Sequence, residues 1–126
     1  MIFGVGTDIV EIERIAKLYS KYGVNFANRI LNPQEKKQLA KTRFPVKFLA
    51  KRFAAKEAWT KALGTGFSNG ITFLDMHIEH DDKGKPLLHA AGAVKQLMQE
   101  YKIVSSHVSI SDERLYATAT VILEIL

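Results

Sequence analysis

The sequence contains no cysteine, and its apolar runs are all short. Without cysteine there is no disulfide framework, no thiolate metal site and no thiol nucleophile. No apolar stretch approaches the roughly 20 residues that a membrane-spanning helix needs, so no membrane partner is expected. The N-terminal segment MIFGVGTDIV has no basic leader, which indicates a strand and not a signal peptide. These absences fit a cytoplasmic protein.

The length and the charge of the chain set broad limits on its class. A chain of 126 residues is expected to form one domain, residues 1–126, and a hydrophobic fraction of 47% is enough for a core. The net charge is +5, from 18 basic and 13 acidic residues. This excess favours an anionic partner, such as nucleic acid, a phosphorylated small molecule or an acidic protein, although solubility alone explains it equally well.

Several segments have apolar residues at helical spacing or carry helix-boundary residues. They are 12–22, a segment that begins at Pro33, Pro45–Leu63 and 94–101. Before the second of these, Asn32 can cap the helix, and Glu35 occupies the position of a capping-box acid. Pro45 suits the first position of the third helix, and Gly64 suits its C-terminal cap.

Alternating apolar and polar residues predict strands at both ends of the chain and in one central hairpin. The expected strands are 1–10, 71–80, 86–89, 107–111 and 115–126. Gly4 and Gly6 would let another element approach the first strand closely. The last strand is apolar on both faces near its end, a pattern typical of burial on both sides and compatible with a subunit contact. This order of elements predicts an α+β fold, a small single domain with a largely antiparallel sheet packed against helices.

The helix expected at Pro45–Leu63 carries charged residues that could handle a charged substrate. Glu57 and Lys61 are at i and i+4, so they share one face, and on an ordinary helix they would form a solvated ion pair worth roughly 0.2–0.5 kcal/mol. The nearby Ala54 and Ala58 are small enough to let a ligand or another backbone come close. Because a glycine-rich loop also follows directly, a functional role for the pair becomes more favourable.

Asp8 is an isolated carboxylate near the end of an otherwise apolar strand. Taken alone, it could simply cap a turn or the following helix. Paired with Glu57 across the fold, it would form a candidate magnesium site. Mg²⁺ uses few protein carboxylates, keeps several waters and takes phosphate oxygens as its remaining ligands. The sequence leaves open whether the two carboxylates meet.

Other patterns point less clearly to chemistry. The loop GTGFSNG at 64–70 lacks the Gly-Lys-Ser/Thr ending of a P-loop and follows a helix instead of preceding one. His107 and Ser109 share a strand face, but this spacing does not establish a nucleophile–base pair. The other histidines show no zinc-site spacing. No RNA-binding aromatic motif or groove-reading helix is evident, so nucleic acid is not expected as a partner.

Three stretches together carry a family resemblance. They are GTDIVEIERI at 6–15, RFAAKEAWTKALGTG at 52–66 and HVSISDE at 107–113. In this order and at these spacings they resemble the holo-acyl-carrier-protein synthases, the short bacterial type of phosphopantetheinyl transferase. The resemblance implies transfer of the 4′-phosphopantetheine group of coenzyme A to a serine of apo-acyl carrier protein. It also implies Mg²⁺ as cofactor, adenosine 3′,5′-bisphosphate as product and a place in fatty acid biosynthesis.

The resemblance implies specific roles at the reaction centre. Asp8 and Glu57 would hold the metal against the pyrophosphate of coenzyme A, and Glu57 would also orient or deprotonate the serine hydroxyl through water. Lys61 would stabilise charge on the leaving phosphate or protonate it. Glu35 either helps to position the serine or only caps its helix.

The resemblance also implies a set of residues that bind coenzyme A. These are Arg52, Gly64, Gly66, Lys85, Pro86 and His107. Arg52 and His107 would lie near the 3′-phosphate, with His107 supplied by a neighbouring subunit, because the family forms homotrimers with sites at subunit boundaries. The segment 111–113 receives no role from the resemblance.

The resemblance also implies a partner, acyl carrier protein, for a basic stripe on the helix at 12–22. Arg14, Lys17 and Lys21 recur at helical spacing, and acyl carrier proteins are small and strongly acidic. We expect these three residues, with Arg29 as a further candidate, to steer the carrier protein to the enzyme, in contacts that weaken with salt.

Two other functions remain open from the sequence. One is a non-enzymatic basic module that binds nucleic acid, which the net charge supports. The other is a different metal-dependent phosphoryl transferase or hydrolase, such as a nucleotide pyrophosphatase, which the paired carboxylates would equally serve.

Overall fold

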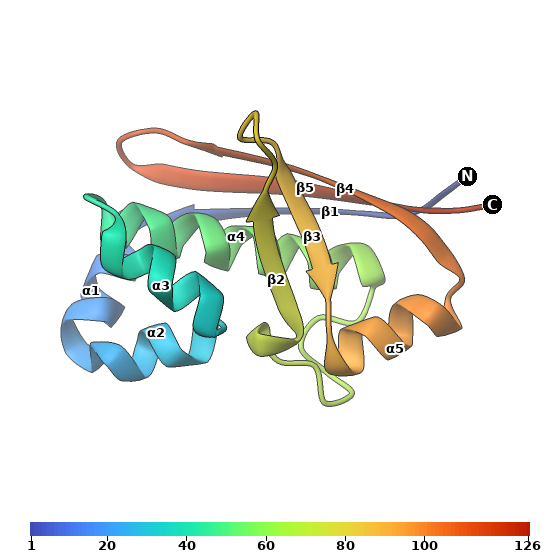
Figure 1. Cartoon of the computed structure of the whole chain (residues 1–126), viewed down its shortest axis with the longest axis horizontal. Helices are drawn as coiled ribbons and strands as arrows, with labels where there is room; N and C mark the ends of the chain where they lie inside the picture. Colours follow the sequence, from blue (N-terminus) through green and yellow to red (C-terminus); the bar gives the residue numbers. More distant parts are fainter.

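The computed structural model describes residues 1–126 and confirms the α+β order of elements (Figure 1). The helices are α1 (Ile12–Tyr22), α2 (Val24–Ile30), α3 (Pro33–Lys41), α4 (Pro45–Leu63) and α5 (Gly92–Glu100). The strands are β1 (Ile2–Glu11), β2 (Met76–His80), β3 (Pro86–Ala90), β4 (Ile103–Asp112) and β5 (Tyr116–Ile125). None of the helices combines the length and the apolar character that crossing a membrane requires.

All strand pairs are antiparallel, as predicted. Strands β1, β5 and β4 form a three-stranded sheet in that order, and β2 pairs with β3 in a separate hairpin. Helix α4 lies along the three-stranded sheet and contacts all three of its strands. Helices α1, α2 and α3 gather near the N-terminal half of α4, whereas α5 lies toward its C-terminal end (Figure 1). Residues of α4 are therefore the ones that can meet both the sheet and the smaller elements.

The close approach expected at Gly4 and Gly6 is confirmed, and the element that approaches is α4. A Cβ atom on Gly4 would overlap the carbonyl of Ala62, and one on Gly6 would overlap the carbonyl of Ala58. The alanines of α4 are fully or almost fully buried against the sheet. This backbone-to-backbone contact holds the end of β1, and with it Asp8, at a fixed position beside α4.

The opposite face of the three-stranded sheet has no covering element. Val5 and Ile9 of β1 are 54% and 64% exposed, while Val121 and Leu123 of β5, on the α4 side, are fully buried. In the register of the sheet, Val5 lies opposite Ile122 and His107 lies opposite the same residue on the other side. An apolar strip next to His107 is therefore left open in the protomer.

The helix boundaries read from the sequence are confirmed. Asn32 caps α3, where its Oδ1 accepts a hydrogen bond of 2.9 Å from the Glu35 amide and Glu35 Oε1 accepts one of 3.1 Å from the Asn32 amide. Helix α4 begins at Pro45, and Gly64 ends it in the left-handed conformation. The short helix α2 was not predicted, because its seven residues are too few to display a helical period.

The prediction of a strand over 71–80 was wrong in its first half. The strand begins at Met76, and Phe73–Asp75 form a single 3₁₀ turn. The Thr72 hydroxyl accepts from the Leu74 amide, and an Asp75 carboxylate oxygen accepts from the Thr72 amide at 2.9 Å. These side-chain bonds supply partners that a strand ladder would otherwise provide, so a local turn replaces the strand. In the C-terminal hairpin, β4 also begins earlier than predicted, at Ile103.

Candidate active site

The structure brings Asp8 and Lys61 into direct contact at the edge between β1 and α4. Lys61 Nζ donates to Asp8 Oδ1 at 3.1 Å, and the Asp8 side chain is only 14% exposed. Both residues line a cavity of about 350 Å³ together with Thr118 and Thr120 of β5. An acidic and a basic group are thus presented side by side in a hollow at the sheet surface.

Glu57 faces the same group of charges, one helical turn before Lys61. Burial raises the pKa of Glu57, and the negative charge of Asp8 raises this pKa further, whereas Lys61 and Arg14 act in the opposite direction. A carboxylate whose pKa responds to Asp8, Lys61 and Arg14 lies within electrostatic reach of all three. The carboxylates of Asp8 and Glu57 are therefore close enough to interact, a point that the sequence left open.

These two carboxylates fit a divalent cation that keeps waters and phosphate oxygens as its other ligands. The structure contains no group of three or more His, Cys, Asp or Glu residues that could hold a metal by itself. A two-carboxylate site is below that number and matches the few protein ligands that Mg²⁺ uses at phosphate sites. The repulsion that raises the Glu57 pKa is also the kind that a cation relieves.

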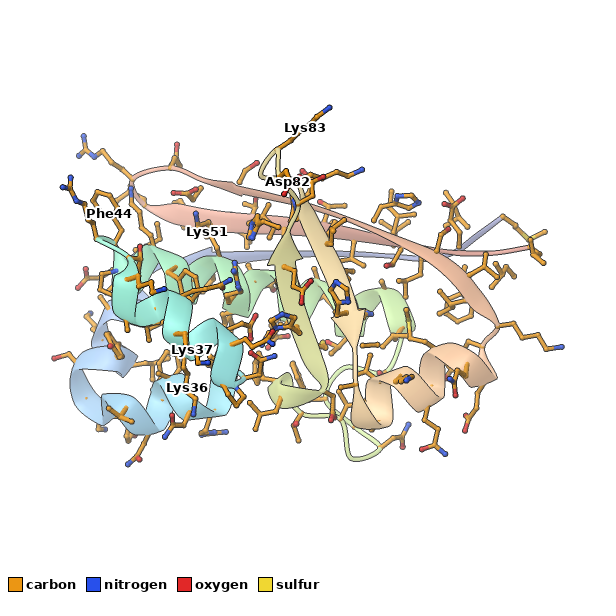
Figure 2. All side chains as sticks on the ribbon, viewed as in Figure 1. Lys36, Lys37, Phe44, Lys51, Asp82 and Lys83 are labelled. Carbon is orange, nitrogen blue, oxygen red and sulfur yellow. The ribbon has the colours of Figure 1, made fainter.

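Arg52 lies at a second site, a cavity of about 390 Å³ between α3, α4 and the β2–β3 hairpin. Lys51 and His80 line this cavity too, as do Gly84 and Pro86 of the hairpin turn. Lys51 projects from α4, and Asp82 and Lys83 mark the tip of the neighbouring hairpin (Figure 2). Three basic side chains around one hollow are suited to an anion such as a phosphate.

The charge of this second cavity also acts on His80. Burial lowers the pKa of His80, and the positive charges of Arg52 and Lys51 lower this pKa further, while Asp81 opposes them. The acidic Asp112 also lines the cavity and lies 3.8 Å from Lys51 Nζ. The neutral form of His80 is therefore favoured relative to an ordinary histidine, and an anion beside its basic neighbours would favour the charged form.

Of the other residues implied in coenzyme A binding, Pro86 lines the Arg52 cavity, whereas His107, Gly64 and Gly66 do not. His107 is on the open face of the sheet, where its Nε2 contacts Glu124 Oε1 at 2.6 Å, and this bond lowers the pKa of Glu124. Gly64 and Gly66 form the turn after α4, both with positive φ. The side chain of Lys85 is exposed in the hairpin turn, between two residues that line the Arg52 cavity.

The basic stripe of α1 is exposed, as predicted. Arg14, Lys17 and Lys21 all lie on the solvent side of this helix, and Lys21 Nζ lies 5.2 Å from the ring centre of Tyr22. Arg14 is the member whose charge also reaches Glu57. The stripe thus borders the Asp8–Glu57 site.

Sequence reasoning missed a buried ion cluster around Glu35. Lys56 is fully buried, and its Nζ donates to Glu35 Oε1 at 2.7 Å and to the Ile30 carbonyl at 2.6 Å. Glu35 is fully buried as well, so its carboxylate cannot meet an incoming serine in this conformation. The one signal in the sequence was that α4 is apolar or small on nearly every side of Lys56, which indicates burial all round.

Comparisons with known proteins agree with the motifs. Residues 4–121 match the model of the 4′-phosphopantetheinyl transferase superfamily. A holo-[acyl-carrier-protein] synthase of Vibrio cholerae serotype O1 is 55% identical over 98% of both chains. The crystal structure of the Neisseria meningitidis holo-[acyl-carrier-protein] synthase matches with a TM-score of 0.94 at 44% identity, covering 98% of this chain and 99% of that one.

A third relative was solved with a ligand. The structure of a Bacillus anthracis holo-(acyl-carrier-protein) synthase in complex with CoA (3′,5′-ADP) matches with a TM-score of 0.83 at 38% identity, over 100% of this chain and 99% of that one. The fold, the order of the motifs and the near-complete coverage agree in all three cases. This chain therefore belongs to the 4′-phosphopantetheinyl transferase superfamily, among its holo-[acyl-carrier-protein] synthases.

Proposed function

We propose that this protein transfers 4′-phosphopantetheine from coenzyme A to a serine of apo-acyl carrier protein, in support of fatty acid biosynthesis. The observation that carries the proposal is the meeting of Asp8, Glu57 and Lys61 at one edge of the sheet, with Asp8 and Lys61 in direct contact. The relatives of similar length and fold are holo-[acyl-carrier-protein] synthases, which supports the same activity for the whole of residues 1–126.

The reaction needs charge to be offset on a diphosphate. Asp8 and Glu57 would hold Mg²⁺, which when bound supplies positive charge to the phosphate oxygens that accumulate negative charge. The serine oxygen forms a bond to the β-phosphorus of coenzyme A, and the bond from that phosphorus to the bridging oxygen breaks. The leaving group is adenosine 3′,5′-bisphosphate, and the phosphopantetheine remains on the serine.

Glu57 and Lys61 have complementary roles in this step. A glutamate with a raised pKa is a stronger base than an ordinary one, so Glu57 suits acceptance of the serine proton, through a water where the hydroxyl is out of direct reach. Lys61 Nζ is half-exposed and is fixed by Asp8 at 3.1 Å, a position from which it can stabilise or protonate the leaving phosphate.

The Arg52 cavity is the proposed site for the 3′-phosphate of coenzyme A. Its basic side chains and the hairpin turn at Lys85 and Pro86 support this. The Gly64–Gly66 turn, which the resemblance also implies in coenzyme A binding, lies past Lys61 at the C-terminal end of α4. Helix α4 carries both Arg52 and Glu57, five residues and thus about 7.5 Å apart along the helix axis. A nucleotide that contacts both sites has to extend around the helix, because five residues also turn the helix by about 140°.

A homotrimer would explain the open sheet face and the position of His107. Val5 and Ile9 are more than half exposed on that face, and His107 lies beside them without reaching the Arg52 cavity of its own chain. A neighbouring subunit that covers the apolar strip would bring its own His107 toward the boundary between subunits. Light scattering coupled to size exclusion tests this state, which Ile9→Glu should reduce to a monomer.

The basic stripe of Arg14, Lys17 and Lys21 is the proposed docking surface for acyl carrier protein. It is exposed and borders the Asp8–Glu57 site, so an acidic partner bound there would place its serine near Glu57. Such contacts mainly speed the encounter and weaken with salt. Because both substrates are intracellular metabolic components, the proposed location is the cytoplasm.

The decisive experiment incubates the protein with coenzyme A, Mg²⁺ and apo-acyl carrier protein and reads the products by mass spectrometry. The expected result is a carrier protein heavier by one phosphopantetheine, together with adenosine 3′,5′-bisphosphate, and no reaction when Mg²⁺ is replaced by a chelator. Cleavage of coenzyme A with an unchanged carrier protein would instead establish a hydrolase. Binding to nucleic acid at moderate salt, without transfer, would support a basic binding module.

A further inference from the structure

The guanidinium of Arg52 is buried at the wall of a cavity and is held there by several side chains. Arg52 is only 3% exposed although it lines the basic cavity of about 390 Å³. Its Nη2 donates to Gln38 Oε1 at 3.0 Å, and its Nε lies 3.2 Å from Glu35 Oε2. The guanidinium carbon also lies 4.5 Å from the ring centre of Phe48, in a cation–π arrangement. Three residues from two helices thus fix one side chain.

Glu35 is itself immobilised on every side of its carboxylate. Oε1 accepts from the Asn32 amide at 3.1 Å and from Lys56 Nζ at 2.7 Å, and Oε2 accepts from the Ile78 amide at 3.1 Å. Because these partners come from α3, α4 and β2, the carboxylate has a single possible orientation. The charge contact with Arg52 Nε is therefore made by a rigid group.

One donor of the Arg52 side chain is left without a hydrogen bond. Its Nε is buried and, despite the short distance to Glu35, has no aligned acceptor. The second terminal nitrogen of Arg52 likewise has no protein acceptor among the side-chain hydrogen bonds. Because Nε is buried, donation into the cavity falls to the terminal nitrogens, which a guanidinium oriented by Glu35 and Gln38 can present to an anion at the cavity wall.

We propose that Glu35 and Gln38 are positioning residues that hold the guanidinium of Arg52 toward a phosphate in this cavity. The inference deepens the proposed function and rests on it for the identity of that phosphate, the 3′-phosphate of coenzyme A. Glu35 acts only through Arg52, since it is fully buried and does not line the cavity. This role replaces the positioning of the serine that the sequence left open for Glu35.

The test measures equilibrium binding of two nucleotides that differ by one phosphate. Adenosine 3′,5′-bisphosphate and adenosine 5′-monophosphate are titrated into the protein by calorimetry. In Gln38→Leu we expect the affinity for the bisphosphate to fall about tenfold while the affinity for the monophosphate is unchanged. The matched control is Gln34→Leu, the same change one turn earlier on α3 at a residue that does not line the cavity, which should leave both affinities as they are.

Glu35 is tested in a variant that avoids an extra buried charge. In Glu35→Gln combined with Lys56→Met, one acid and one base are removed together, and Arg52 keeps Gln38 and Phe48 as partners. We expect a similar selective loss of bisphosphate affinity. The companion variant Lys56→Met with Glu35 intact should bind both nucleotides normally. Thermal unfolding before each titration confirms that the variants are folded.

The outcomes separate this inference from the proposed function. Equal weakening of both nucleotides in Gln38→Leu, or no weakening of either, overturns the positioning role. A wild-type protein that does not prefer the bisphosphate also overturns it, because then no phosphate enters the Arg52 cavity. Preserved preference for the bisphosphate without transfer to apo-acyl carrier protein would refute the proposed reaction but leave the positioning role standing.

Discussion

Helix α4 carries two clusters of charged side chains, one facing α3 and the other facing β1. In the first, Arg52 and Lys56 surround Glu35, and both oxygens of that carboxylate are occupied by donors. In the second, Lys61 contacts Asp8, and Glu57 lies nearby with a raised pKa. Both clusters combine acids with bases, and both draw residues from α4, a helix of 19 residues.

The difference between the clusters is the degree to which their charges are satisfied. Glu35 and Lys56 are fully buried and bonded to each other, so neither can bind a ligand without breaking an existing contact. Asp8 and Glu57 repel each other, and the side chain of Lys61 is 50% exposed. A buried carboxylate whose oxygens all have donors stabilises the fold, whereas repelling carboxylates beside a cavity can bind a cation and do chemistry.

The largest expected effect is a loss of activity when a carboxylate of the Asp8–Glu57 cluster is changed. In Glu57→Gln and in Asp8→Asn, transfer to apo-acyl carrier protein should fall by roughly 10²–10⁴-fold, because a proton acceptor or a metal ligand is lost. Stability should stay the same or increase, since each change removes the repulsion between two carboxylates. Initial rates at saturating Mg²⁺ and thermal unfolding measure the two quantities.

A matched control for these variants is Glu100→Gln, an exposed acid on α5 at the other end of the molecule (Figure 1). It should change neither the rate nor the unfolding temperature. Full activity in Glu57→Gln or in Asp8→Asn would contradict the assignment of the site.

The next largest expected effect is a loss of stability when the buried Glu35 cluster is changed. Glu35→Gln leaves Lys56 and Arg52 as buried cations without a carboxylate, and such a loss typically costs about 3–5 kcal/mol. Unfolding by urea should show a decrease in the free energy of unfolding of this size. Glu35→Leu with Lys56→Met should cost clearly less, because both charges are then absent. An unchanged unfolding free energy in Glu35→Gln would remove the distinction between the two clusters.

The sequence pointed to the Asp8–Glu57 cluster but not to the buried Glu35 cluster. The boundaries of α4 were readable because Pro45 and Gly64 impose them locally. Asp8, Glu57 and Lys61 were readable because they sit in motifs that a family resemblance identifies. The structure adds what the motifs could not supply, which is that Lys61 bonds to Asp8 and that Glu57 faces them both.

The buried cluster depends on tertiary contacts that no local pattern encodes. Glu35 and Lys56 are 21 positions apart, and Glu35 and the amide of Ile78 are 43 apart. In the sequence, Glu35 satisfies a capping box and Lys56 belongs to a helix, so each has a sufficient local explanation. The strand start at Met76 was missed for a different, local reason, since the turn at Thr72 and Asp75 overrides an alternating pattern.

A smaller effect is expected on the docking stripe. Lys17→Glu with Lys21→Glu should raise the KM for acyl carrier protein about tenfold at low salt and leave kcat and the KM for coenzyme A unchanged. These two lysines are preferable to Arg14, because the charge of Arg14 reaches Glu57 and its loss would also alter the pKa there. Steady-state rates at two salt concentrations provide the measurement.

The control for the stripe is Lys95→Glu with Lys102→Glu, which reverses the same number of charges on α5 and the turn after it. If this pair raised the KM as much as the stripe variant, net charge and not a defined surface would govern the encounter. A stripe variant that weakened only coenzyme A binding would show that these lysines belong to the nucleotide site.

The smallest effect is a dependence of nucleotide binding on pH through His80. In the free protein, burial together with Arg52 and Lys51 holds the pKa of His80 below its ordinary value, against the opposing charge of Asp81, and Asp112 is the other acid at the cavity. A bound phosphate offsets the basic neighbours and raises this pKa, so binding takes up a proton at pH values between the free and the bound pKa. Affinity for adenosine 3′,5′-bisphosphate should therefore increase, by about threefold, as the pH falls through this window.

Proton uptake is measured directly by calorimetry in two buffers of different ionisation enthalpy. In His80→Gln the uptake assigned to the histidine should disappear, leaving only the titration of the nucleotide, whose second phosphate pKa is near 6. An unchanged proton uptake in His80→Gln would assign the pH dependence to the ligand alone. The basic cavity would then resemble the Glu35 cluster, with charges fixed in place, and the ability to change protonation state would be confined to the Asp8–Glu57 site.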